Sequence, residues 1–321
     1  MRHFIVLACL LIAGCNQHQS ALAPFGVEAA HTRSLMIVMV AAAVVLAGLT
    51  AFLYVRAVRA PEGSLDHAGG MRLVLWMGAI VPTILLAALL IYALPAMKPM
   101  DSTPADLRIR VEGEQFWWRV MYERNGGAAP IVDANEIRIP VGRTVVFTLT
   151  STDVVHSFWV PGLAGKMDMI PGRDNRLVVK AERPGYYRGV CAEFCGFSHA
   201  LMAFEIIAME PDQFDLWLAT RNVPVRSAAS NAEGARLFTR NGCGACHAIR
   251  GTPHSGRIGP DLSRFGERRT LGAGTLEPNL ANTSAFIRDP QASKPGARMP
   301  AYAGLSPADA DAIATYLKGL K

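Results

Sequence analysis

The chain has 321 residues, of which 51% are hydrophobic, and a formal net charge of +6. This length exceeds that of one ordinary domain, so we expect two domains together with membrane segments. The six cysteines exclude a scaffold of long-range disulfides, because two lie in the first fifteen residues and the other four form two close pairs, Cys191 with Cys195 and Cys243 with Cys246.

Residues 1–22 have the pattern of an export signal. Arg2 precedes the apolar stretch FIVLACLLIAG, and Cys15 follows it directly. The letters IAGC at 12–15 resemble the lipobox of bacterial lipoproteins, which would make Cys15 the lipidated first residue of the mature chain. The alternative is an ordinary signal peptide cleaved near residues 21–23.

Residues 34–97 contain two apolar runs long enough to cross a bilayer as helices. The first, 34–55, has no charge, and the second, 71–97, has only Arg72 at its edge and contains Pro82, which membrane helices tolerate. The short loop between them is rich in arginine, which favours the cytoplasmic side. We therefore expect a transmembrane hairpin with the N-terminus and the C-terminal part on the outer face.

Residues 101–220 contain several segments rich in Val, Ile, Thr and aromatic residues, such as EIRIP and RTVVFTLTST, separated by Gly and Pro turns. They predict an antiparallel β-sandwich or barrel, closed by a short helix at about 211–220. Residues 221–230 read as a linker. Residues 231–321 predict a small α-helical domain, whose last helix begins with Ser306 as N-cap and Pro307 at the first helical position.

The two soluble domains differ in charge. Residues 101–220 hold twelve basic and sixteen acidic side chains, a net of −4, whereas residues 221–321 hold fourteen and seven, a net of +7. Complementary charge favours transient docking of one domain on the other. The alternative is a basic face that meets lipid or nothing specific. We expect no nucleic-acid partner.

The segment CAEFCGFSHALM gathers two thiols, an imidazole and a thioether in one short loop, and His156 lies upstream at the end of a predicted strand. Soft sulfur and imidazole ligands suit copper. A single cysteine would make a mononuclear blue-copper site, but two thiolates can bridge two copper ions. The alternative is a structural disulfide between Cys191 and Cys195.

The pattern H…CxExCxxxHxxM resembles the binuclear copper A centre of cytochrome c oxidase subunit II and of nitrous oxide reductase. The stretches LTSTDVVHSFWVPGLAGKMDMIPGR and PGYYRGVCAEFCG extend the resemblance to subunit II over nearly the whole sandwich, which that family builds as a cupredoxin. The resemblance implies that the thiolates of Cys191 and Cys195 bridge the two copper ions and that His156 and His199 are the terminal imidazole ligands. It also implies Met202 as a weak thioether ligand and Glu193 as a ligand through its backbone carbonyl. It also implies that the Glu193 side chain reaches a magnesium ion shared with subunit I.

GEQFWWRVMYE resembles the aromatic patch at which these subunits receive electrons, which makes Phe116, Trp117 and Trp118 candidates for that role. The first aromatic is Phe116, where many mitochondrial-type subunits have Trp. The alternative is that alternating aromatics on a strand are ordinary core residues.

NGCGACHAIR contains CxxCH, the signature of covalent c-type haem attachment through Cys243 and Cys246, with His247 as an axial iron ligand. A redox dithiol or half of a zinc site are the alternatives. The following IGPDL stretch and Met299 before Pro300 resemble a class I cytochrome c, which implies Met299 as the second axial ligand. That ligand pair raises the haem potential relative to two nitrogen ligands.

The combined resemblance is to subunit II of a caa-type cytochrome c oxidase (EC 7.1.1.9), a multi-domain protein with a transmembrane hairpin, a cupredoxin and a fused cytochrome c domain. It implies an electron relay from cytochrome c or another periplasmic donor, through one covalent haem c and copper A, to the haem-copper site of subunit I. Subunits I and III and a bacterial inner membrane, crossed twice, are the expected surroundings.

One departure from the family pattern lies in the second apolar run, and two rival functions stay open. Related oxidases often have an acidic residue three positions before the tryptophan of the second helix, but Leu73 stands there before Trp76, so a proton-uptake role is not implied. The rival functions are the electron-accepting subunit of a copper A-containing nitric oxide reductase and a non-enzymatic copper-binding lipoprotein.

Overall fold

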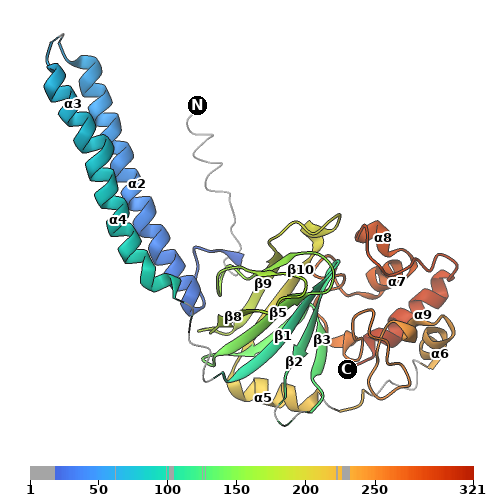
Figure 1. Ribbon diagram of the computed structural model, residues 1–321. Helices are drawn as coiled ribbons and strands as arrows, with labels where there is room; N and C mark the ends of the chain where they lie inside the picture. Colours follow the sequence, from blue (N-terminus) through green and yellow to red (C-terminus); the bar gives the residue numbers. More distant parts are fainter. Residues whose placement is uncertain are drawn as a thin grey trace. The chain divides into compact units, whose positions relative to one another are not determined.

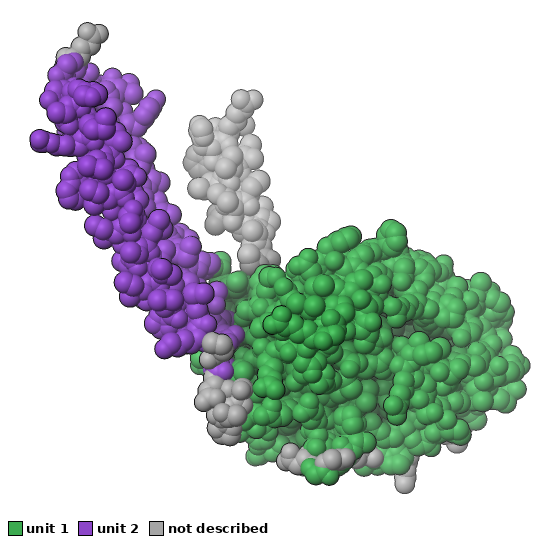
Figure 2. All heavy atoms as spheres, in the orientation of Figure 1, with its two compact units in different colours: residues 1–27, 101–321 green, residues 28–100 purple. Residues whose placement is uncertain are grey.

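The computed structural model describes residues 19–321 except 62, 99, 101–104, 125, 127, 222 and 226–231. The chain divides into two compact units, residues 28–100 and residues 1–27 with 101–321 (Figure 2). Cys15 and most of the predicted signal 1–22 lie outside the described residues, and so does most of the predicted linker 221–230.

The first unit consists of two long apolar helical segments (Figure 1). Helix α2 spans Val27–Arg59, and the second segment runs through α3 (His67–Leu75), a π-helical turn η2 (Trp76–Ile80), α4 (Val81–Ala93) and a 3₁₀ turn η3 (Leu94–Met97). Their mean hydropathies reach 2.6 and 2.5. By length and composition both are able to cross a membrane, so the predicted pair of apolar helices is confirmed.

The β domain is a sandwich of two five-stranded sheets (Figure 1). The first sheet has the order β3 (Ile131–Ala134), β2 (Trp117–Tyr122), β1 (Leu107–Glu114), β5 (Val145–Ser151) and β8 (Asn175–Val179). The second has the order β4 (Glu136–Pro140), β10 (Ala203–Met209), β9 (Gly185–Cys191), β6 (His156–Trp159) and β7 (Met167–Met169). Helix α5, Pro211–Thr220, follows β10 with the predicted bounds.

The sandwich is confirmed, but the expectation that it is purely antiparallel is wrong. Strand β1 pairs with β5 in parallel, and β4 pairs with β10 in parallel. After the β1–β2–β3 meander the chain crosses to the second sheet through β4 and returns to the first as β5. Parallel neighbours require such crossovers, and the composition of a strand does not encode its direction.

Alternating side chains of the strands fill the space between the sheets. In β2 the burial alternates along the strand, with Trp118, Val120 and Tyr122 inside. Trp118 is fully buried and packs on Phe158 and Phe204, with ring centroids 5.9 and 4.8 Å away. The period of two thus places one face of each strand in the core.

The C-terminal domain is helical and has its own hydrophobic core. It contains α6 (Ala232–Arg240), α7 (Leu280–Arg288), α8 (Pro290–Ser293) and α9 (Pro307–Lys318), with 3₁₀ turns η7 (Cys243–Ala245) and η8 (Phe265–Glu267). Helix α9 begins as predicted, because the Ser306 hydroxyl accepts a hydrogen bond from Asp309 N at 3.1 Å. The predicted helical domain is confirmed.

Candidate metal centres

Strands β6 and β9 bring a buried imidazole and a buried sulfur to the same place in the second sheet. His156 begins β6, Cys191 ends β9, and Phe158 of β6 is the register partner of Cys191. The chain then forms the loop 192–202, whose base is closed by a 3.0 Å hydrogen bond from Cys191 N to Met202 O. The loop thereby meets a histidine 35 residues upstream.

Two unbonded sulfurs form the centre of this cluster. The Sγ atoms of Cys191 and Cys195 lie 3.8 Å apart, and both cysteines are free and buried. Each sulfur faces its own imidazole: Cys191 Sγ lies 3.8 Å from Nδ1 of His156, and Cys195 Sγ lies 3.6 Å from Nδ1 of His199. The arrangement is that of a shared sulfur pair with one terminal nitrogen at each sulfur.

Two weaker donors complete the cluster, one at each sulfur. The Sδ atom of Met202 lies 3.8 Å from Cys195 Sγ, and the Glu193 carbonyl oxygen lies 3.2 Å from Cys191 Sγ. Met202 is 1% exposed, whereas the Glu193 side chain points into solvent. The structure therefore brings together all six residues that the sequence suggested as copper ligands.

Asp153 fixes the orientation of His156. Its carboxylate accepts a 2.9 Å hydrogen bond from His156 Nε2, and a 2.7 Å bond from Gln115 N. Burial lowers the pKa of His156, but its hydrogen bonds to the Cys191 sulfur and to Asp153 outweigh burial and raise that pKa. With Nε2–H donating to Asp153, the Nδ1 lone pair is left for a metal, the usual carboxylate–histidine–metal arrangement.

Close packing at His156 depends on one glycine of the neighbouring sheet. A Cβ atom at Gly113 of β1 would lie 2.8 Å from the His156 ring. Since real Cβ atoms do not approach that closely, a side chain at this position would displace the imidazole. The hydrogen bond between the two sulfurs lowers the pKa of Cys191 and raises the pKa of Cys195. A positively charged metal replaces the proton of such a bond.

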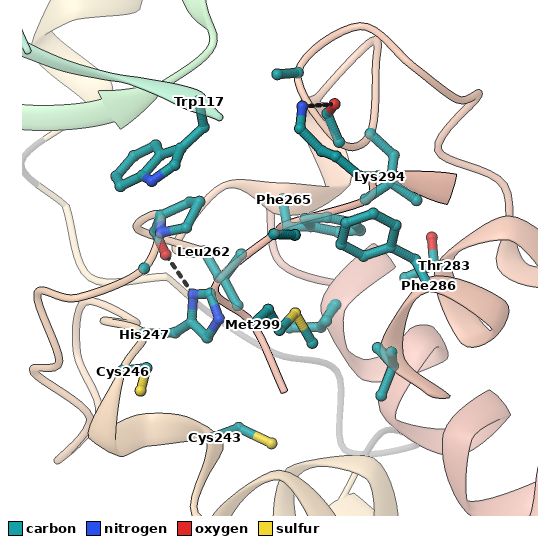
Figure 3. Close-up of a pocket in the computed structure, with 18 of the residues that line it drawn as sticks. Trp117, Cys243, Cys246, His247, Leu262, Phe265, Thr283, Phe286, Lys294 and Met299 are labelled. Carbon is teal, nitrogen blue, oxygen red and sulfur yellow. Dashed lines mark hydrogen bonds between the residues drawn. The ribbon is translucent and has the colours of Figure 1, made fainter. Parts of the chain in front are cut away.

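The second candidate centre is an apolar pocket in the helical domain (Figure 3). Cys243, Cys246, His247 and Met299 line it together with many apolar side chains, including Leu262, Phe265, Phe286, Ile287, Ile313 and Leu317. Figure 3 shows His247 and Met299 reaching into the pocket, with the two cysteine sulfurs at its lower edge in this view. The structure thus brings together the four residues that the sequence assigned to haem.

His247 is held as a neutral imidazole. Its Nδ1 donates to the Pro260 carbonyl at 2.8 Å, which leaves Nε2 free to face the pocket. Burial lowers the pKa of His247, so the imidazole is uncharged at neutral pH. The predicted proline stretch therefore braces the histidine. Gly259 N also donates to Cys246 O at 2.9 Å, which ties this stretch to the CxxCH segment.

Comparison with known proteins agrees with both centres. Residues 123–209 match the family described as cytochrome c oxidase subunit II, periplasmic domain, and residues 231–321 match the family cytochrome c. Cytochrome c oxidase subunit 2 of Alkalihalophilus pseudofirmus is 41% identical over 251 residues, 75% of this chain and 71% of the relative. This chain belongs to the cytochrome c oxidase subunit II family.

Further relatives carry the same name. Cytochrome c oxidase subunit 2 of Bacillus subtilis is 33% identical over 264 residues, 75% of this chain and 73% of the relative. The solved periplasmic domain of subunit II (CoxB) of Bradyrhizobium japonicum is 32% identical and covers 38% of this chain and 96% of its own, with a TM-score of 0.35.

Membership in the family fixes the general role of this subunit II. It is part of cytochrome c oxidase, EC 7.1.1.9, its role is electron transfer, and it works in a complex with subunit I. Its apolar helices and its periplasmic-domain family indicate a membrane-anchored protein with a domain outside the membrane. The donor sets fit the groups that these two domains carry, because thiolates, imidazoles and a thioether suit copper A, and CxxCH with a facing methionine suits haem c.

The three aromatic residues proposed to receive electrons occupy different positions. Trp118 lies in the sandwich core, 6.2 Å from the His156 ring between centroids. Phe116 and Trp117 line the haem pocket, although they belong to the sandwich. The Arg119 guanidinium lies 4.7 Å from the Trp117 ring centroid, a cation–π contact. The core interpretation therefore holds for Trp118, but not for Trp117.

Opposite charges meet where the cytochrome and sandwich domains touch, as the charge difference predicts. Among the described residues, three arginines of the cytochrome domain pair with carboxylates of the sandwich, namely Arg268 with Asp133 at 3.3 Å, Arg269 with Glu205 at 2.7 Å and Arg298 with Asp153 at 3.2 Å. Lys294, 3% exposed, donates to the Leu201 carbonyl at 3.0 Å, one residue before the candidate copper ligand Met202. Whether this docking is transient stays a prediction.

Sequence reasoning missed several residues that support the two centres. Asp153 stands three positions before His156, and a carboxylate so close to a candidate metal histidine was a usable signal. Arg268 and Arg298 carried no signal, because their roles arise only from contacts across more than a hundred residues.

Proposed function

We propose that this chain is the subunit at which electrons enter the oxidase. When bound, haem c and copper A each carry one electron at a time, and the proposed order is external donor, haem c, copper A and then the haem-copper site of subunit I. The observation that supports this order is Trp117, which lines the haem pocket from the sandwich, while the next residue, Trp118, packs beside His156.

Within this proposal the copper centre would be binuclear. Cys191 and Cys195 would hold the two ions together, since their sulfurs lie side by side and each faces a different histidine. Met202 and the Glu193 carbonyl would provide the weak ligands. The exposed Glu193 side chain is available to a magnesium ion shared with subunit I.

Cys243 and Cys246 would attach the haem through thioether bonds, and His247 and Met299 would ligate its iron. Apolar side chains around the pocket would limit the access of water to the haem, and exposure to water is one of the features that set a haem's reduction potential. Fusion to the sandwich raises the effective concentration of the haem domain at its acceptor. The external donor is cytochrome c or another periplasmic carrier.

The proposed assembly contains subunits I and III in a bacterial inner membrane. Two membrane passes would put both ends of the anchor on the same side of the membrane. The arginines between residues 56 and 72 favour a cytoplasmic loop, so both soluble domains would lie on the periplasmic face. Lipidation of Cys15 would add a second anchor. The departure at Leu73 leaves proton uptake outside the proposal.

Dioxygen and nitric oxide consumption by the membrane complex purified through this chain tests the proposal, with reduced cytochrome c as donor. We expect dioxygen uptake that Cys191→Ser abolishes, together with the mixed-valence copper signal in electron paramagnetic resonance. Turnover of nitric oxide alone would move the complex to the reductases. If the complex bound copper but consumed neither gas, the result would favour the rival function, a non-enzymatic copper-binding lipoprotein.

A further inference from the structure

Hydrogen bonds from the cytochrome domain reach the turn that carries two candidate copper ligands. This 3₁₀ turn, η5 (His199–Leu201), begins with the candidate ligand His199 and leads directly into Met202. At its start the Ser198 hydroxyl, which is fully buried, donates to the Pro295 carbonyl at 2.6 Å. The first end of the turn is therefore bonded to a residue of the other domain.

The second end of the turn is bonded to the cytochrome domain as well. The Leu201 carbonyl accepts a hydrogen bond from Lys294 Nζ at 3.0 Å. Ala203 N donates to the Ala273 carbonyl at 2.9 Å. Leu201 and Ala203 are the two chain neighbours of Met202, so the main chain on both sides of this candidate ligand is held by the other domain.

Lys294 makes the most demanding of these contacts. It is 3% exposed, and its Nζ also donates to the Gly272 carbonyl at 2.6 Å, so it joins one carbonyl of each domain. Burying an ammonium group is costly unless it is hydrogen-bonded. Because Lys294 needs both acceptors, it fixes the Leu201 carbonyl, and with it the end of the turn, as long as the two domains are docked.

The other candidate imidazole ligand has a weaker link to the same domain. Asp153, which accepts a hydrogen bond from His156 Nε2, also pairs with Arg298 at 3.2 Å. The Arg298 side chain is 57% exposed, and an ion pair so accessible to water contributes little. Lys294 is therefore the residue through which these cross-domain contacts are best tested.

A shift of the turn would move two candidate ligands together. His199 Nδ1 and Met202 Sδ face the same sulfur, at 3.6 and 3.8 Å from Cys195 Sγ. Outer groups that fix the orientation of metal ligands are worth about 10- to 100-fold in metal affinity. Since the cytochrome domain supplies such groups to this half of the cluster, its docking and the binding of copper should depend on each other.

We propose that the docked cytochrome domain is a structural part of the copper centre, with Lys294 as a positioning residue for the turn that carries His199 and Met202. This inference rests on the proposed copper A centre. Coupling between two binding equilibria is reciprocal, so the factor by which docking raises the affinity for copper is the factor by which copper favours docking. A copper-loaded chain therefore keeps docked the domain whose haem is proposed to deliver the electron.

The first test needs no variant. The Arg269 amide reports docking, because it donates to the Glu136 carboxylate of the sandwich at 2.6 Å and neither residue belongs to the copper cluster. Hydrogen exchange at this amide is measured on the full chain in detergent, before and after loading with copper. We expect copper to slow the exchange about tenfold. Exchange at the same rate in both states would overturn the inference.

The second test isolates Lys294. Lys294→Met removes the ammonium group but keeps an unbranched side chain. Lys318→Met is the matched control, because Lys318 lies on α9 and makes none of the contacts to the turn described above. Copper affinity is measured by competition with a chelator and read by electron paramagnetic resonance. We expect Lys294→Met to bind copper about tenfold more weakly, or by about 1.4 kcal/mol, and Lys318→Met to match the wild type.

Equal copper affinity in Lys294→Met and Lys318→Met would overturn the inference. The haem absorption spectrum shows whether the cytochrome domain is folded in each variant, and if Lys294→Met lost that spectrum, the exchange test on the wild type would decide. A wild-type chain that bound no copper would instead refute the proposed function.

Discussion

Asp153 is expected to set copper affinity although it does not touch the metal. Its carboxylate holds His156 by a 2.9 Å hydrogen bond to Nε2 and also accepts from Gln115 N and pairs with Arg298. In Asp153→Asn the side chain offers one oxygen where several donors converge, including Val154 N at 2.7 Å, and the charge that stabilises the Nε2–H form is lost. Loss of such a partner costs about 10- to 100-fold in metal affinity, or about 1.4 to 2.7 kcal/mol.

The assay is a competition titration of copper against a chelator with the full chain in detergent, read by electron paramagnetic resonance. Asp174→Asn is the matched control, because Asp174 forms an exposed ion pair with Arg110 at 2.9 Å and is not part of the copper cluster. We expect control affinity equal to that of the wild type. If Asp153→Asn bound copper as tightly as Asp174→Asn, the orienting role derived for Asp153 would be refuted.

Three further predictions concern stability and haem attachment. Burial raises the pKa of Glu136 although Arg269 N donates to its carboxylate at 2.6 Å. The stability of the folded state therefore falls as the pH rises from the unfolded-state pKa of Glu136 to its raised folded-state pKa. Glu136→Gln should therefore raise Tm at neutral pH, with no gain below about pH 4; an equal gain at both pH values would contradict this. A Cβ at Gly234 would lie 2.1 Å from Ala312 O, where α6 meets α9, so Gly234→Ala should cost about 1 to 3 kcal/mol in denaturant unfolding, and wild-type stability would argue against this close helix contact. Haem should stay on the chain through acid–acetone extraction, and full release of the haem would rule out the thioether bonds.

Much of the fold followed from local patterns. The apolar runs predicted the two long helices, and Ser306 with Pro307 predicted the start of α9, because caps and hydropathy act over a few residues. The parallel pairing of β1 with β5 was not predictable in this way. It depends on a crossover between sheets, which no strand composition records.

The copper cluster was readable from the chain because Cys191, Cys195, His199 and Met202 lie within twelve consecutive residues, and resemblance to a known motif assigned His156 to the same site. The residues that support the two centres from outside were harder to read from the sequence. Asp153 stands three residues before the candidate ligand His156, which is a usable sequence signal, whereas Trp117 and Arg268 acquire their positions from the contact between the two soluble domains. Such long-range contacts depend on tertiary packing.

The relay order is tested most directly by rapid mixing of reduced external cytochrome c with the oxidised complex, following haem c and copper A by their separate absorption. The account predicts that haem c is reduced first, at a rate proportional to donor concentration, and that copper A follows at a rate independent of that concentration. Reduction of copper A before haem c, or at a rate that rises with donor concentration without limit, would contradict it.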